Sequence, residues 1–173
     1  SGVVYLFSFT DSAFSGGNLE ATLGSGYSGG KNINLDLEAS DFFGVNVALD
    51  GNRLAVGVSG DDGFENGCSS CGAAYLITFD DSSFNGGELA SIIGSGYTSG
   101  KNLNVPIDAS DSFGQGIALD GNQLAIAGIG DDAAGGGTSG AGAVHMFTFS
   151  DGEFSDAQLQ GIVGSGFSGG ENV

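Results

Sequence analysis

The sequence repeats itself with a period of 70 residues and no insertions, and this repeat limits the possible folds more than any other feature. Residues 2–9 (GVVYLFSF) return as 72–79 (GAAYLITF) and again as 142–149 (GAVHMFTF). We divide the chain into a first copy (2–71), a second copy (72–141) and a partial third copy (142–173). One unit of a repeat architecture cannot bury its apolar face alone. We therefore expect a piece of a longer array, or a subunit that is completed by other chains.

Short runs rich in Val, Ile, Phe and Tyr alternate with clusters of Gly, Asn, Asp and Ser, and helix signals are almost absent. This pattern predicts strands, which we place in the first copy at residues 3–9, 19–23, 32–37, 45–49 and 53–58. Asp50-Gly51-Asn52 predicts a hairpin turn between the last two, because Gly and its Asp or Asn neighbours tolerate positive φ. The sequence thus predicts an all-β fold of antiparallel sheet repeats of about 70 residues, each like a β-propeller blade and incomplete as a single chain.

The net charge is −18, from 21 acidic and 3 basic residues, and the acids are spread over all copies. Such a surface repels phosphate backbones, so we expect no nucleic acid partner. It attracts divalent cations and is typical of secreted or salt-adapted proteins. No run approaches the roughly 20 apolar residues of a membrane helix, so we expect no membrane insertion.

Residues 39–57 (ASDFFGVNVALDGNRLAVG) and the Gly60-Asp61-Asp62 that follows resemble an FG-GAP repeat, with Phe43-Gly44 as its Phe-Gly pair. The resemblance covers residues 39–79 and 109–149 and is closest to repeats of large secreted bacterial surface proteins. It implies β-propeller blades whose strands straddle adjacent repeats, as in the integrin α-subunit head. It also implies an extracellular or cell-surface location, and adhesion or recognition rather than catalysis.

Many proteins of this family bind Ca²⁺, but the D-x-D-x-D-G calcium loop of integrin-type repeats is absent here. The best candidate ligands are two carboxylate pairs, Asp61-Asp62 and Asp131-Asp132, which lie beside Gly-rich backbone. Ca²⁺ takes roughly six to eight oxygen ligands, and these pairs could supply several. The alternative is that the first Asp of each pair caps a turn by accepting backbone N–H groups. Ca²⁺ is the only cofactor that the sequence suggests.

The only two cysteines form the motif Cys68-Ser69-Ser70-Cys71 in a loop rich in Gly and Asn. We favour a local disulfide, which implies an oxidising compartment, and free thiols are the alternative. A redox motif would need a βαβ setting, and a zinc site would need further ligands.

The single histidine, His145, stands where the earlier copies have Tyr5 and Tyr75, and we interpret it as a packing substitution. Nucleophilic catalysis requires a Ser or Cys with a positioned base. Every prominent acid recurs with the repeat, whereas an active site is normally singular. The chain is therefore predicted not to be an enzyme.

These observations favour an extracellular structural or adhesive repeat module, in a surface adhesin or a self-assembling filament. The expected partners are molecules of the same chain or further repeats, with a host-surface protein or glycan as a further candidate. A strand left at the edge of an incomplete sheet invites pairing. The alternative function is Ca²⁺-dependent binding of carbohydrate or protein by a β-propeller module.

Overall fold

The computed structural model describes residues 1–173 and contains strands and one short 3-10 helix, with no α-helix. The elements are β1 (Val3–Ser8), β2 (Asn18–Gly24), β3 (Ile33–Asn34), β4 (Phe43–Asp50), β5 (Arg53–Val58), η1 (Phe64–Asn66), β6 (Ala73–Thr78), β7 (Glu88–Gly94), β8 (Leu103–Asn104), β9 (Phe113–Asp120), β10 (Gln123–Gly128), β11 (Ala143–Thr148) and β12 (Gln158–Gly164). No helix is long and apolar enough to span a membrane. The predicted all-β class is confirmed.

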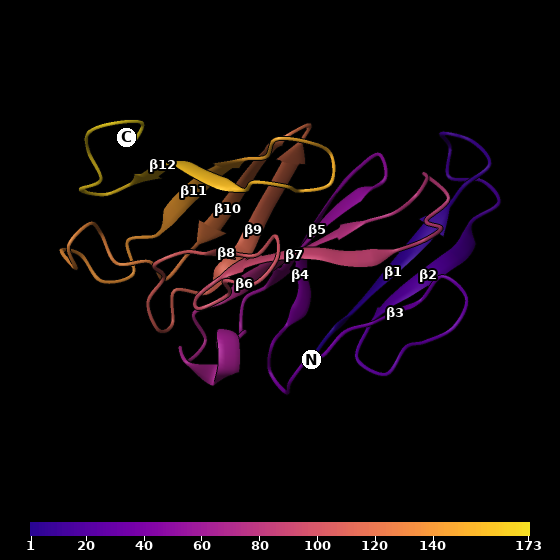
Figure 1. The fold of residues 1–173 in the computed structure, drawn as a ribbon, viewed down its shortest axis with the longest axis horizontal. Helices are drawn as coiled ribbons and strands as arrows, with labels where there is room; N and C mark the ends of the chain where they lie inside the picture. Colours follow the sequence, from indigo (N-terminus) through magenta and orange to yellow (C-terminus); the bar gives the residue numbers. More distant parts are fainter.

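The strands form three sheets that follow one another along the long axis of the molecule (Figure 1). The N-terminal sheet has the order β1-β2-β3, the central sheet β4-β5-β6-β7-β8, and the C-terminal sheet β12-β11-β10-β9. Pairing is antiparallel except for the two-residue strands β3 and β8, which pair in parallel with β2 and β7. The sheets are stacked like blades, but they do not close into a propeller.

The sheets are out of phase with the sequence copies. The central sheet takes β4 and β5 from the first copy and β6, β7 and β8 from the second. Its hairpin is confirmed, since Asp50 pairs with Arg53 and Gly51 has a φ of 62°. A three-stranded remainder is left at the N-terminal end, where β1 has no neighbour on its outer side. Strands therefore straddle adjacent copies.

The strand predicted at 32–37 is wrong in length, because only Ile33–Asn34 pairs with β2. In place of further backbone hydrogen bonds between strands, two asparagine side chains bond to the backbone here. Oδ1 of Asn32 accepts the Thr22 N–H at 2.8 Å, and Oδ1 of Asn34 accepts the Gly26 N–H at 2.6 Å. The following residues leave the sheet, and Leu35 is buried in the core.

Two hydrophobic cores hold the three sheets together. The first lies between the N-terminal and central sheets and contains Leu6, Leu23 and Ile77. The second lies between the central and C-terminal sheets and contains Leu76, Ile93 and Phe147. Neighbours on a strand point to opposite faces, so Leu76 and Ile77 enter different cores. The central sheet is thus covered on both faces.

The Phe-Gly pairs lie where adjacent sheets touch most closely. Phe43 and Phe113 are buried, and the backbone of each contacts a glycine of the sheet before it. A Cβ on Gly72 would lie 2.1 Å from the carbonyl O of Phe113. Only glycine fits there, and the Phe113 N–H donates to the carbonyl O of Cys71 at 2.8 Å. This contact fixes the spacing between sheets.

Candidate functional site

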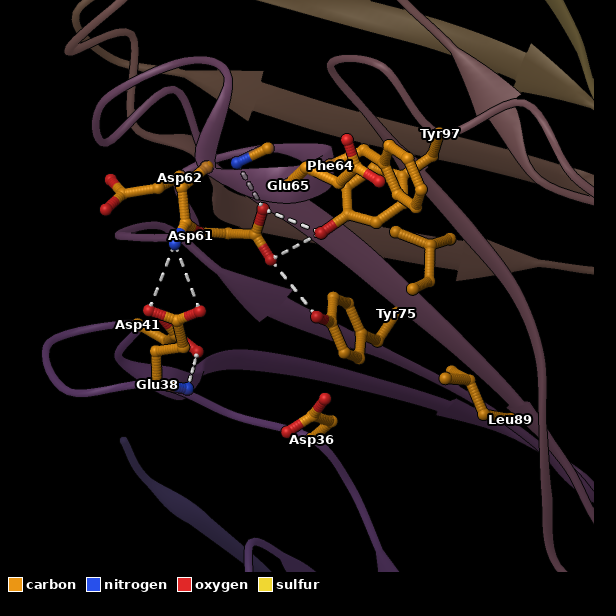
Figure 2. A pocket seen from close by; sticks show the side chains of 13 residues that line it. Asp36, Glu38, Asp41, Asp61, Asp62, Phe64, Glu65, Tyr75, Leu89 and Tyr97 are labelled. Carbon is orange, nitrogen blue, oxygen red and sulfur yellow. Dashed lines mark hydrogen bonds between the residues drawn. The ribbon is translucent and has the colours of Figure 1, made fainter.

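The central sheet carries a cavity of about 360 Å³ with many carboxylates in its wall (Figure 2). The acids come from loops and the short helix η1 of the first copy, and the tyrosines and aliphatic residues come from the second. The lining residues are Asp36, Glu38, Asp41, Asp61, Asp62, Gly63, Phe64, Glu65, Asn66, Tyr75, Leu89, Ile92 and Tyr97. The cavity therefore forms only where two successive copies meet.

Asp61 is one of two buried acids in the wall of this cavity, the other being Asp41, and three protein groups donate hydrogen bonds to Asp61. The Gly63 N–H donates to Oδ1 at 2.8 Å, and the Tyr75 hydroxyl donates to Oδ2 at 3.1 Å. The Tyr97 hydroxyl lies 3.0 and 3.1 Å from the two oxygens. Both oxygens of Asp61 are thus occupied by protein donors, as the dashed lines in Figure 2 show.

Burial and hydrogen bonding act in opposite directions on this acid. Burial raises the pKa of the Asp61 carboxyl, and the bonds from Gly63, Tyr97 and Tyr75 oppose that rise without cancelling it. Burial also raises the pKa of the Tyr75 hydroxyl, and the Asp61 charge adds to the effect. Both tyrosines therefore keep their protons at neutral pH and remain donors to Asp61.

The second acid of each pair caps a loop. Oδ1 of Asp62 accepts the Ser70 N–H at 2.6 Å, and Oδ1 of Asp132 accepts the Gly140 N–H at 2.7 Å. A carboxylate that accepts backbone N–H groups a few residues away stabilises a turn. The alternative that the sequence left open named the first acid of each pair, and of the two only Asp61 accepts a nearby backbone N–H, from Gly63.

The equivalent site of the C-terminal sheet has different side chains. His145 replaces Tyr75, Phe167 replaces Tyr97, and Asp131 has no hydroxyl donor. Nε2 of His145 lies 3.8 Å from Oδ2 of Asp131, and Nδ1 of this buried histidine has no hydrogen-bond partner. The ring packs edge-on against Phe113, with centroids 5.3 Å apart.

The two groups of this second site do not form a charged pair at neutral pH. Burial, followed by the charges of Asp111, Asp108 and Asp132, raises the pKa of Asp131 to about 6. Burial lowers the pKa of His145 to about 4. At pH 7 the histidine is therefore neutral beside an ionised Asp131.

No group of three or more His, Cys, Asp or Glu side chains is arranged to hold a metal ion. The four predicted calcium ligands occur as two separate pairs. Asp61-Asp62 lie between β5 and β6, and Asp131-Asp132 lie between β10 and β11. A metal at Asp61 would have to displace the hydroxyl and N–H donors described above. Calcium binding at these acids stays a prediction.

Cys68 and Cys71 are free thiols in this structure. The Sγ of buried Cys71 lies 2.9 Å from the carbonyl O of Cys68, and the Sγ of Cys68 lies 3.6 Å from the carbonyl O of Ile107. Burial raises the pKa of the Cys71 thiol, so it is protonated at neutral pH. The disulfide between them stays a prediction.

Sequence reasoning missed Tyr75 and Tyr97 as partners of Asp61. The signal was a joint change, because the third copy replaces both tyrosines, by His145 and Phe167. Two hydroxyls that are present together and absent together indicate a shared partner. Spacing alone could not reveal it, since the acid belongs to the preceding copy.

A second candidate site consists of the two outermost sheet faces. The N-terminal outer face exposes Tyr5, Phe7, Phe9 and Phe14, and the C-terminal outer face exposes Met146 and Val163. Phe14 is 74% exposed, whereas its equivalents Phe84 and Phe154 are 5% and 0% exposed. Met146 is 47% exposed, whereas its equivalents Leu6 and Leu76 are 6% and 0% exposed. Each outer face is thus one half of an interface that occurs twice inside the molecule.

Comparison with known proteins agrees with the fold. A family model described as FG-GAP repeat matches residues 33–77, a segment from β3 to β6 that contains Phe43-Gly44 and the β4–β5 hairpin. No curated protein and no solved structure matches the chain. FG-GAP repeats are generally non-catalytic. Residues 33–77 are an FG-GAP repeat, in agreement with the resemblance seen in the sequence.

Proposed function

We propose that the chain is a non-enzymatic, extracellular structural module whose sheets stack face to face on further sheets of the same kind. The setting would be a surface adhesin or a self-assembling filament. The observation that carries the proposal is the exposure of residues on the two outer faces whose equivalents are buried between sheets. An apolar patch of this kind marks an interaction site.

The interior supplies the geometry of the contact. In both internal interfaces, the face that carries Leu6 or Leu76 meets the face that carries Ile77 or Phe147. The C-terminal outer face is equivalent to the faces that carry Leu6 and Leu76. The N-terminal outer face is equivalent to the faces that carry Ile77 and Phe147. Such a contact joins two different surfaces, so it produces an open array unless the rotation closes a ring.

The C-terminal outer face has a hollow of about 400 Å³ lined by Gln123, Ala125 and Met146 among others. At the equivalent place on the central sheet, the guanidinium of Arg53 lies 5.7 Å from the ring centre of Phe154, which belongs to the C-terminal sheet. We infer that the hollow takes the phenylalanine of an added sheet at the position of Phe14. This residue is the most exposed aromatic on the N-terminal outer face.

One internal contact has no counterpart at the C-terminal outer face. Nζ of Lys31 donates to the carbonyl O of Ser83 at 2.6 Å, and Nζ of Lys101 donates to the carbonyl O of Glu153 at 2.8 Å. Each bond joins two adjacent sheets. The third copy has Glu171 at this position, which cannot donate. Stacking on this face is therefore expected to be weaker than the internal stacking.

The test is the molar mass of the purified chain across a wide concentration range, measured by analytical ultracentrifugation. We expect association that Phe14→Asp or Met146→Asp abolishes and Glu171→Lys strengthens. Thr98→Asp adds the same charge at an exposed position outside both faces and should leave the association unchanged. A chain that stays monomeric at the highest concentration, with Glu171→Lys also monomeric, would overturn face-to-face stacking.

A further inference from the structure

The N-terminal sheet lacks the two strands with which the other two sheets begin. The central sheet starts with β4 and β5 and the C-terminal sheet with β9 and β10, but the N-terminal sheet starts directly with β1. The outer edge of β1 is therefore unpaired. In the other sheets this edge is covered by a hairpin, which is followed by the Asp-Asp pair.

Tyr5 and Tyr27 lie at backbone positions equivalent to those of Tyr75 and Tyr97, the two tyrosines that bind Asp61. Tyr5 is opposite Thr22 on β2, and Tyr75 is opposite Ile92 on β7, which is the same register 70 residues later. A Cβ added to Gly24 would lie 3.4 Å from the Tyr27 ring, and one added to Gly94 would lie 3.0 Å from the Tyr97 ring. Both hydroxyl-bearing rings are therefore placed alike in the two sheets.

The N-terminal pair has no carboxylate. Tyr5 is half-exposed, whereas Tyr75 is buried and donates to Asp61. Tyr5 has no carboxylate partner, and the interaction with the neighbouring Tyr27 side chain raises the pKa of Tyr5. The central sheet, by contrast, provides both of its tyrosines with an acid, Asp61.

We propose that Tyr5 and Tyr27 form a receptor for the carboxylate of an aspartate that follows an incoming β-hairpin, and that this hairpin pairs with the free edge of β1. The occupant is the end of a further repeat of this type, equivalent to residues 39–70. This inference rests on the proposed function, since it takes the N-terminal end as a place where further repeats pack. It adds the segment and the side chain that are recognised.

The backbone supports the same docking. The Gly72 N–H donates to the carbonyl O of Asp61 at 2.9 Å, and the Gly142 N–H donates to the carbonyl O of Asp131 at 2.9 Å. Gly2 is the equivalent residue of the N-terminal sheet, and its position is as crowded as that of Gly72. A Cβ on Gly2 would lie 2.0 Å from the carbonyl O of Phe43. That crowding comes from the central sheet, and the Gly2 N–H is the equivalent of the donors of Gly72 and Gly142.

A second folded molecule of this chain is a poor occupant of the β1 edge. Its two hairpins, β4–β5 and β9–β10, already lie inside sheets and pair with β6 and β11. To donate one of them, the second molecule would have to open its own sheet. Face-to-face stacking has no such requirement, so the two contacts at this end are separable by experiment.

The test is an extended chain in which residues 39–70 are placed before Ser1. This fusion keeps the register because residue 71 is the equivalent of residue 1, and the added cysteine is removed by Cys68→Ser in the added segment. We expect slower hydrogen exchange of the β1 amides and a higher midpoint of thermal unfolding. A double-mutant cycle between Asp61→Asn in the added segment and Tyr5→Phe should show coupling of about ten-fold in the unfolding equilibrium constant, the size of one hydrogen bond to a charged group.

Asp62→Asn in the added segment is the matched control, because Asp62 caps its own loop and does not contact the tyrosines. It should show no coupling to Tyr5. Protection of β1 without Asp61–Tyr5 coupling would overturn the tyrosine receptor and leave packing of repeats standing. An added segment that stays unfolded and leaves β1 exchanging as before would overturn both.

Discussion

The Asp61 and Asp131 sites occupy equivalent places in the central and C-terminal sheets, yet their side chains differ. Asp61 accepts bonds from Gly63, Tyr75 and Tyr97. Asp131 lies beside a neutral His145 at 3.8 Å and has no such donors. The two loops nevertheless share a backbone bond of equal length, from Gly72 to Asp61 and from Gly142 to Asp131. The comparison teaches that the backbone frame forms the turn, and that the carboxylate network is added to it.

The largest difference is expected on removing each acid. Asp61→Ala leaves the buried Tyr75 hydroxyl without its acceptor and should lower the free energy of unfolding by about 3 kcal/mol. Asp131→Ala removes a carboxylate that burial already disfavours, so the loss should be below about 1 kcal/mol. Urea unfolding at pH 7 measures both. Equal losses would mean that the tyrosine network contributes nothing specific.

The pH dependence of the C-terminal sheet separates its two groups. The pKa of Asp131 is raised to about 6, so its contribution to stability grows as pH falls from 7 to 4. The pKa of His145 is lowered to about 4, so its contribution is lost over the same window. In the natural chain the two trends oppose each other. Asp131→Asn removes the contribution of Asp131. Between pH 7 and pH 4 the free energy of unfolding of this variant should therefore fall by on the order of 2 kcal/mol more than that of the natural chain.

The matched control for that titration is His145→Phe, which keeps an aromatic ring against Phe113. This variant removes the loss of stability that His145 causes at low pH, so it should gain stability relative to the natural chain as pH falls. Asp61 titrates in all three proteins and cancels in the differences. Parallel pH profiles for the natural chain and both variants would contradict the assignment.

The part of the fold that local residues determine was predictable. Asp50-Gly51-Asn52 correctly indicated the turn between β4 and β5, because a two-strand hairpin depends on a few adjacent residues. The strand predicted at residues 32–37 was too long. Its alternating apolar residues are also compatible with a segment that leaves the sheet and still buries every second side chain. The cavity was not predictable from spacing, because Asp61 and Tyr97 are 36 residues apart and meet only after the sheets form.

A conversion of one site into the other tests the comparison directly. His145→Tyr with Phe167→Tyr restores both hydroxyls beside Asp131. Hydrogen bonds to the ionised form should lower the pKa of Asp131 from about 6, and stability at pH 7 should rise by about 1 to 2 kcal/mol. NMR titration of the Asp131 carboxyl reports the first change and urea unfolding the second. Phe167→Tyr alone is the control and should give a smaller effect, whereas an unchanged pKa in the double variant would show that the hydroxyls do not reach the acid.

Calcium is expected to have the smallest effect on stability, and the two sites differ in the hydrogen bonds that a bound cation would have to displace. At Asp61 the oxygens already accept protein donors, and a cation would have to replace three hydrogen bonds before it gained any ligand. At Asp131 no donor has to be displaced. The predicted calcium ion should therefore bind at Asp131, and millimolar CaCl₂ should raise the unfolding temperature by about 1 °C over EDTA, since a ligand stabilises the state that binds it. Asp131→Asn should remove this rise and Asp61→Asn should keep it. Equal unfolding temperatures in CaCl₂ and EDTA, or a rise that only Asp61→Asn removes, would contradict this expectation.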